Sequence, residues 1–207
     1  MLNANYLNNL NLSKDNILSL SNTMREQENF SFAENAIKKA KLNPQNDDLL
    51  IEAFCEIQGW GGYYGRPNEK RNWQTKDNLN KYKEFMIEVK SIKKDNIPDC
   101  FWDYFYPNGI KKIKGVAISF GSKHLKFINN NYVVYDSIIA KIINDKKEPS
   151  PNGYKFFHKW CLKKSKVTNT KIYQVEEAVW HKLYPNYCNP IKREEIKKWI
   201  NNFKNLI

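Results

Sequence analysis

Residues 119–139 read SFGSKHLKFINNNYVVYDSII. A helix-like apolar run comes first, three asparagines follow it, and a short run of branched and aromatic residues leads to a second apolar run. This pattern predicts a helix over 121–128, a reversal of the chain at the asparagines, and an extended segment over 132–136. A second helix is expected directly after Asp136, which has the position of an N-cap.

Two charged side chains in this stretch, Lys123 and Asp136, are expected to meet. The first helix carries the chain about 9 Å from the lysine to the asparagines, and the extended segment can return roughly 13 to 16 Å. The aspartate therefore comes level with the lysine. Taken alone, such a lysine is typical of a solvated helix surface and such an aspartate is typical of a helix cap, so the pairing depends on the rest of the chain.

The rest of the sequence predicts a mostly α-helical protein. Only residues 132–135 combine branched and aromatic side chains as a strand does, so we expect at most one short extended segment. A chain of 207 residues with no repeats and no linker is expected to form a single helical domain over 1–207. Outside the opening stretch, helical patterns are predicted over 17–41, 47–62, 76–94, 137–144, 154–164, 174–183 and 192–203.

The chain is strongly basic. It has 34 Lys and Arg against 22 Asp and Glu, a net charge of +12, and this excess favours a polyanionic partner, with nucleic acid as the first candidate. An alternative is that an AT-rich genome has enriched Lys, Asn and Ile at exposed positions, and Asn-rich stretches such as 3–11 agree with that bias.

Several classes of site and location are excluded by the residue pattern. The four cysteines and three histidines are scattered without paired spacing, so neither a metal site nor a cofactor is expected. No window approaches a membrane span, and residues 1–16 have no leader pattern. We therefore expect a cytoplasmic protein with reduced thiols that makes no membrane contact.

The order GVAISFGSKHLKF followed by VVYDSII resembles the signature region of the helix-hairpin-helix DNA glycosylase superfamily. It is most similar to the short 8-oxoguanine-glycosylase-like branch of that superfamily. The resemblance implies a glycosylase-like helical bundle whose hairpin and catalytic segment occupy about 110–145. Within that segment it implies a hairpin over 113–120, Gly121 as the glycine that opens the helix, Lys123 as the nucleophile and Asp136 as the acid.

The resemblance also implies a reaction. A DNA glycosylase with AP lyase activity uses a lysine amine to displace a base at C1′, and the resulting Schiff base permits strand cleavage by β-elimination. Desolvation and nearby cations such as Lys114, His124 and Lys126 are expected to lower the pKa of Lys123. Asp136 is expected to stabilise the positive charge that develops on the sugar.

The expected partner is double-stranded DNA that contains a damaged or modified base, bound by a monomer. Basic groups and a helix N-terminus would hold phosphates, and aromatic side chains would stack on the extruded base, although such side chains also serve core packing. The expected DNA contacts are Lys111, Lys112, Lys114, Gly121, Ser122 and Arg66. The expected base pocket consists of Trp60, Tyr63, Tyr64 and Trp102.

Other functions fit the same residues. A non-catalytic helix-hairpin-helix DNA-binding protein would bind DNA without releasing any base. A basic helical interaction protein would show no salt-dependent affinity for DNA. The identity of an excised base also stays open, because 8-oxoguanine follows only from the resemblance, and a modified base in invading phage DNA would use the same lysine and aspartate.

Overall fold

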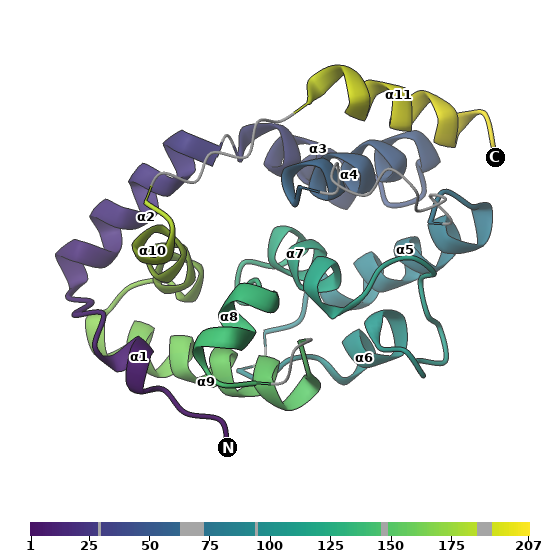
Figure 1. Cartoon of the computed structure of the whole chain (residues 1–207). Helices are drawn as coiled ribbons and strands as arrows, with labels where there is room; N and C mark the ends of the chain where they lie inside the picture. The colour runs from purple at the N-terminus through teal and green to yellow at the C-terminus, as the bar shows by residue number, and fades with distance from the viewer. Residues whose placement is uncertain (29, 63–72, 94, 146–148, 186–191) are drawn as a thin grey trace.

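The computed structural model describes residues 1–28, 30–62, 73–93, 95–145, 149–185 and 192–207 (Figure 1). These residues form eleven α-helices and no strand, which confirms the predicted mostly α-helical fold. None of the helices in these ranges has the length and apolar character needed to cross a membrane. The helices are α1 (Asn5–Asn8), α2 (Lys14–Glu28), α3 (Ser31–Leu42), α4 (Asp47–Trp60), α5 (Lys76–Val89), α6 (Asp99–Phe105), α7 (Ile118–Ile128), α8 (Ser137–Ile142), α9 (Pro151–Thr168), α10 (Ile172–Leu183) and α11 (Arg193–Lys204).

Local signals in the sequence account for several helix boundaries. The side chains of Asn46, Thr75 and Ser150 each accept a hydrogen bond from a backbone amide in the first turn of α4, α5 and α9, respectively. Pro151 follows Ser150 as the first residue of α9, where its missing N–H has no cost. Asn169 ends α9 in the left-handed conformation.

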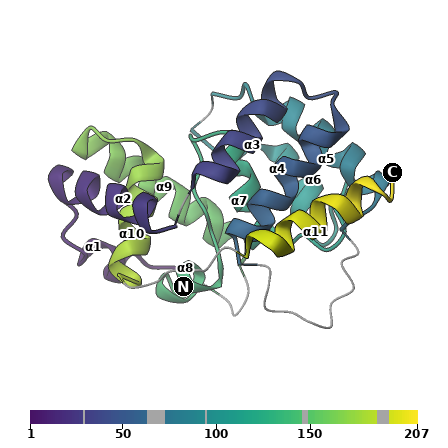
Figure 2. The same cartoon turned by 90° about the horizontal axis from the view of Figure 1, so that it is seen from above.

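The helices gather in two groups (Figure 2). One group contains α2, α9 and α10 with α1 and α8, and the other contains α3 to α7 with α11. Buried hydrophobic side chains from both groups belong to one core. The segment between α7 and α8 crosses from one group to the other, so residues 119–139 lie at their boundary.

The segment that was predicted to be extended, 132–136, joins α7 to α8 without forming a strand. All five residues are buried, and Asp136 has extended backbone angles. No strand in the described residues pairs with the segment, and side-chain hydrogen bonds from neighbouring helices take the place of a ladder. One of them runs from the Tyr154 hydroxyl to the carbonyl oxygen of Val133 at 2.8 Å.

The start of α7 differs from the expectation. The helix begins at Ile118, three residues before Gly121, so Gly121 does not open it. The preceding turn uses Gly115, whose φ of 77° lies in the left-handed region that favours glycine. Gly121 lies in the first turn of α7, where a Cβ would overlap the ring of Phe105. Its small size therefore allows α6 and α7 to pack closely.

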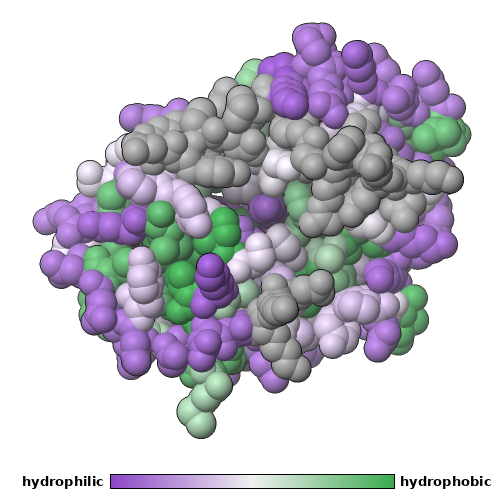
Figure 3. Space-filling view, in the orientation of Figure 1, coloured by the Kyte–Doolittle hydropathy of each residue, from purple (hydrophilic) through white to green (hydrophobic). Residues whose placement is uncertain are grey.

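Hydrophilic side chains form most of the rim of the face seen in Figure 3. Hydrophobic side chains gather inside this rim, over the group that contains α8 and α10.

Candidate functional site

Lys123 lies in the middle of α7, yet its side chain is almost fully buried. The residue is 8% exposed. Its Nζ donates a hydrogen bond to the carbonyl oxygen of Gly61 at 3.2 Å and lies 4.4 Å from the centre of the Phe120 ring. Because Gly61 directly follows α4, the amine lies where the end of that helix meets α7.

Asp136 is the N-cap of α8, as predicted. Its Oδ1 accepts hydrogen bonds from the backbone amides of Ile138 at 3.0 Å and Ile139 at 3.1 Å, and the residue is 7% exposed. Within the described residues, Oδ2 accepts no hydrogen bond. Burial raises the pKa of Asp136, while the charge of Lys123 and the capping amides oppose that increase.

Ser122 and Tyr135 join the two segments that carry the lysine and the aspartate. The Tyr135 amide donates to Ser122 Oγ at 2.9 Å, and the same oxygen lies 3.2 Å from the Tyr135 carbonyl oxygen. Lys123 directly follows Ser122, and Asp136 directly follows Tyr135. The lysine and the aspartate are therefore each one residue from the point where the two segments are joined. The influence of the lysine charge on the pKa of the aspartate agrees with this proximity.

A buried cluster of charges joins the two groups of helices. Lys126 Nζ lies 2.5 Å from Glu176 Oε2 and 3.0 Å from Glu177 Oε1. Arg25 binds the carboxylate of Glu177 through Nε at 2.9 Å and through Nη2 at 3.0 Å, and Ser21 donates to it at 2.6 Å. Both glutamates are completely buried, so the lysine and the arginine provide the compensation that buried carboxylates require.

The charge cluster is electrically coupled to the candidate catalytic pair. Burial raises the pKa of Glu176 to about 7; Lys126 opposes the increase, and the charges of Glu177 and Asp136 add to it. Within the described residues, Glu176 Oε1 has no hydrogen-bond partner. For Lys126, burial acts to lower the pKa, but the two glutamates outweigh it and the pKa is raised. Glu176 is therefore a carboxyl group of this cluster whose pKa is raised towards neutral pH.

Two of the three cations expected beside Lys123 are not free positive charges. His124 is fully buried, and burial, assisted by the charge of Lys123, lowers its pKa to about 3. The expectation that this imidazole acts as a cation is therefore wrong, and its Nδ1 instead lies 3.1 Å from the Tyr82 hydroxyl. Lys126 is charged, but its charge is balanced by Glu176 and a second glutamate, and Lys114 is exposed at the surface.

The residues expected to contact DNA lie in several environments. Lys111 Nζ pairs with Glu88 at 2.9 Å and with Glu84 at 3.3 Å. Lys112 is half-buried and Lys114 is exposed, both on the chain that leads into α7. The charge of Lys111 is thus already partnered, and of these three residues Lys114 has the most exposed side chain.

Three further residues of the expected DNA contacts are placed differently. Gly121 and Ser122 are buried inside α7, where they serve packing and hydrogen bonding rather than facing solvent. Their location gives them a structural part in holding Lys123. Arg66 lies outside the described residues.

The tryptophans expected in a base pocket pack against different helices. Trp60 is buried, and its ring centre lies 5.0 Å from that of Phe30 and 4.9 Å from that of Phe127. Trp102 is half-buried, and its ring centre lies 6.1 Å from that of Tyr154 on α9. Core packing therefore explains the position of Trp60 and part of the position of Trp102. Tyr63 and Tyr64 lie outside the described residues.

Several residues of this site were not predicted from the sequence, among them Gly61, Tyr135 and the glutamates of the charge cluster. A signal existed for the glutamates, because QVEEAVW at 174–180 places two acids in a helical apolar context, and a buried acid requires a partner. No pattern in the sequence indicated that Lys126 is the partner of these glutamates. In the described ranges, no group of three or more His, Cys, Asp or Glu side chains is placed to hold a metal ion.

In comparisons with known proteins, no family model matches the chain, and no curated protein or solved structure matches it significantly.

Proposed function

We propose that the chain is a DNA glycosylase with associated AP lyase activity, with Lys123 as the nucleophile and Asp136 as its carboxylate partner. The observation that carries this proposal is the buried lysine and aspartate, held level by the hydrogen bonds between Ser122 and Tyr135. The resemblance of residues 115–139 to the helix-hairpin-helix glycosylase signature supports the same assignment of roles.

The lysine amine must be neutral to act as a nucleophile, and burial favours the neutral form of an amine. Nζ then attacks C1′ of the target nucleotide while the C1′–N bond breaks, and the base leaves with the bonding electron pair and takes up a proton. Opening of the sugar ring gives a Schiff base between Lys123 and C1′. Loss of a proton from C2′ expels the 3′ phosphate by β-elimination, and hydrolysis of the Schiff base frees the amine.

The carboxylate of Asp136 has two separate tasks in this proposal. Oδ1 is fixed by the first amides of α8, while Oδ2 is left to face the reacting sugar. A negative charge near C1′ stabilises the positive charge that develops there as the base departs. The pKa of Asp136 is raised by burial, which also suits a group that accepts and returns a proton.

The proposed substrate is double-stranded DNA that carries a damaged or modified base, such as 8-oxoguanine. The net charge of +12 supports association with a polyanion, and Lys112 and Lys114 lie on the chain that leads into α7, next in sequence to the site. We assign the activity to a monomer in the cytoplasm. An extruded base must enter beside Lys123, because the target atom is out of reach in a stacked duplex.

The test uses the whole chain and a panel of duplexes, each with one lesion or one abasic site, alongside an unmodified duplex. We expect alkali-independent nicking of at least one lesion duplex and, in the presence of borohydride, a covalent protein–DNA complex. Lys123→Gln should abolish both products. Lys163→Gln, which changes an exposed lysine on α9, is the matched control and should retain them.

Two outcomes would contradict the enzymatic proposal. Salt-dependent DNA binding with no release of any base would indicate a non-catalytic DNA-binding protein. No salt-dependent binding would indicate that the positive charge serves other interactions or reflects genome composition.

A further inference from the structure

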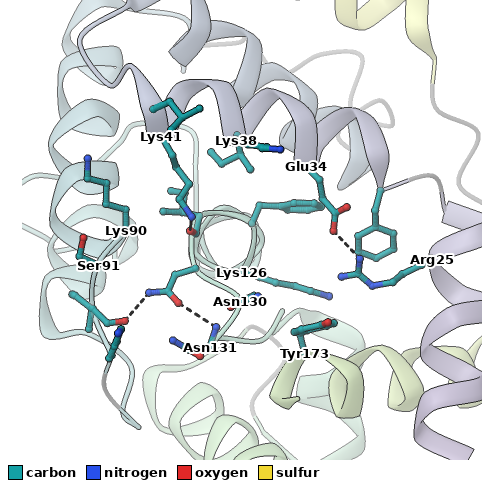
Figure 4. Close-up of a pocket in the computed structure, with 18 residues that line it drawn as sticks. Arg25, Glu34, Lys38, Lys41, Lys90, Ser91, Lys126, Asn130, Asn131 and Tyr173 are labelled. Atoms are coloured by element: carbon teal, nitrogen blue, oxygen red, sulfur yellow. Dashed lines mark hydrogen bonds and ion pairs between the residues drawn. The ribbon is translucent and has the colours of Figure 1, made fainter. Parts of the chain in front are cut away.

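A pocket of about 570 Å³ opens beside the C-terminal end of α7 (Figure 4). Side chains of α3 and α10, the chain that follows α5, and the asparagines after α7 surround it. Neither Lys123 nor Asp136 lines this pocket. Its volume is within the range of small-molecule sites in proteins. The pocket is therefore a second candidate binding site, separate from the proposed reaction centre.

One end of the pocket is positively charged. Lys38, Lys41 and Lys90 project around it from α3 and from the end of α5 (Figure 4). Lys41 Nζ donates to the carbonyl oxygen of Ile128 at 2.8 Å, and burial, together with the charge of Lys90, lowers the pKa of Lys41. Lys41 and Lys90 thus repel one another across a shared space, and an anion placed between them would relieve that repulsion.

The carboxylate present in the pocket lining does not balance the lysine end. Glu34 is the acidic residue among the lining side chains, and it pairs with Arg25 at 2.8 Å on the opposite side of the pocket (Figure 4). Arg25 in turn binds the buried Glu177. The negative charges near the pocket are therefore already engaged with the arginine.

The other end of the pocket offers aromatic surface. The Arg25 guanidinium lies 4.9 Å from the centre of the Phe30 ring and 4.8 Å from the centre of the Tyr173 ring. Phe30 is buried, so the accessible aromatic surface is that of the half-buried Tyr173 and Phe127. The ring centre of Phe127 lies 5.8 Å from that of Phe30. Aromatic rings and a guanidinium plane are the groups on which nucleobases stack.

The wall between the two ends is formed by Asn129, Asn130 and Asn131. Asn129 Nδ2 donates to the carbonyl oxygens of Val89 at 2.9 Å and Ile92 at 2.8 Å, which fixes this part of the wall. Asn130 and Asn131 are exposed beside it. Their amides can both donate and accept hydrogen bonds, as the polar edge of a nucleobase requires.

We propose that this pocket binds a nucleoside phosphate, with the phosphate between Lys38, Lys41 and Lys90 and the base against Tyr173 and Phe127. The two ends match the two chemical parts of such a ligand, and the volume admits a mononucleotide. The phosphate group could belong to a free nucleotide or to the terminal nucleotide of a DNA strand, and both present the same chemistry. The proposal goes beyond the glycosylase activity and does not require it.

Calorimetric titration of the whole chain tests the proposal with four probes: AMP, GMP, inorganic phosphate and adenosine. A short single-stranded oligonucleotide with a 5′ phosphate forms a fifth arm that separates a strand terminus from a free nucleotide. We expect a nucleotide, free or terminal, to bind more tightly than phosphate or adenosine alone. The double variant Lys38→Glu/Lys90→Glu should weaken that binding about tenfold or more, whereas Lys14→Glu/Lys163→Glu, with the same change in charge at exposed positions of α2 and α9, should not.

A footprint on the unmodified protein supplies a second measurement that needs no variant. Acetylation of Lys38 and Lys90, measured by mass spectrometry, should decrease when the nucleotide is present, while acetylation of Lys14 and Lys163 should not change. Absence of nucleotide binding at millimolar concentration, equal affinity for inorganic phosphate, or an unprotected Lys90 would each overturn the proposal. Weaker duplex binding by Lys38→Glu/Lys90→Glu, without nucleotide binding, would overturn it too and would assign the pocket to the DNA-binding surface.

Discussion

Ser122 and Tyr135 are joined through the serine hydroxyl, whose oxygen accepts a hydrogen bond from the Tyr135 amide at 2.9 Å. The same oxygen lies 2.8 Å from the carbonyl oxygen of Ser119 and 3.2 Å from that of Tyr135. The serine is completely buried, so this contact fixes α7 against the segment that leads to α8. The positions of Lys123 and Asp136 relative to each other depend on it.

Replacement of Ser122 by Ala should therefore disturb the pair without touching either reacting group. The Tyr135 amide would be left buried without a partner, at a cost of about 1–3 kcal/mol in the free energy of unfolding. A small displacement of Lys123 relative to Asp136 should lower the single-turnover rate of base excision about tenfold or more. Denaturant unfolding and single-turnover kinetics measure the two effects.

Ser165→Ala provides the matched control for this experiment. The Ser165 hydroxyl donates to the carbonyl oxygen of Leu162 at 2.9 Å on α9, and the residue is also buried. We expect a smaller loss of stability, because no buried amide loses its acceptor, and no change in the excision rate or in the affinity for DNA. Equal rates for Ser122→Ala and the unmodified protein would show that the hydroxyl does not position the pair.

Gly61→Ala should separate activity from stability. The backbone of Gly61 has ordinary right-handed angles, so alanine is tolerated there without strain. A Cβ would approach Lys123 Cδ and a ring carbon of Phe120 to 2.9 Å, and the flexible lysine can move away. We expect nearly unchanged thermal unfolding but slower formation of the borohydride-trapped complex, because the amine has left its hydrogen bond to the Gly61 carbonyl oxygen.

Gly121→Ala is the informative contrast to Gly61→Ala. Its Cβ would meet the buried ring of Phe105, which has no free space to move into. Overpacking of this kind costs about 1–3 kcal/mol in the free energy of unfolding. A large loss of stability in Gly61→Ala as well, or trapping at the normal rate, would show that Lys123 does not depend on the space beside this glycine.

Asp136→Asn should separate helix capping from chemistry. Asparagine is as good an N-cap as aspartate, so Oδ1 can still accept the amides of Ile138 and Ile139. We expect a change in unfolding free energy below about 1 kcal/mol and a decrease of about 100-fold in the excision rate, because the amide carries no negative charge and accepts no proton. Asp136→Ala should lose both the cap and the activity. An active Asp136→Asn variant would remove the aspartate from the proposed mechanism.

Most helices of this fold could be predicted from the sequence because their signals are local, but α1 and α6 were not predicted, and the single helical pattern expected over 17–41 is the two helices α2 and α3. Apolar spacing marks α4, α5 and α10, and residues such as Asn46 and Thr75 provide caps that work wherever the helix packs. The approach of Lys123 to Asp136 was also predictable, because it follows from the rise per residue of a helix and of an extended segment. The role of the Ser122 hydroxyl was not predictable, because its partner is the backbone amide of Tyr135. A backbone amide carries no signal in the residue type.

The charge cluster could not be predicted because its members are far apart in the chain. Lys126 meets Glu176 across 50 residues, and Arg25 meets Glu177 across 152. Lys126 looks like any helix lysine in the sequence, and only the packing of α10 against α2 and the approach of α7 decide its partner. The start of α7 was missed for a related reason, since the packing of Gly121 against Phe105 has no local signal.

Glu176 should make the stability of the protein depend on pH. Its pKa is raised from the usual 4.5 to about 7, and burial is the largest cause. At pH values between 4.5 and 7 the folded protein therefore binds more protons than the unfolded chain. The free energy of unfolding should therefore decrease as the pH rises from about 4.5 to about 7, by roughly 3 kcal/mol at most. Denaturant unfolding at several pH values should show this slope in the unmodified protein and a flatter profile in Glu176→Gln.

Glu177→Gln distinguishes the titration of Glu176 from a general effect of the cluster. Glu177 accepts hydrogen bonds from Arg25 and Ser21 and pairs with Lys126, so its replacement leaves buried positive charge with less compensation. We expect a loss of about 3–5 kcal/mol and a partial flattening of the profile, smaller than in Glu176→Gln, because the charge of Glu177 is one of the causes that raise the pKa of Glu176. If both variants flattened the profile equally, the proton would be shared by the two carboxylates. If neither did, the pH dependence would come from outside the cluster.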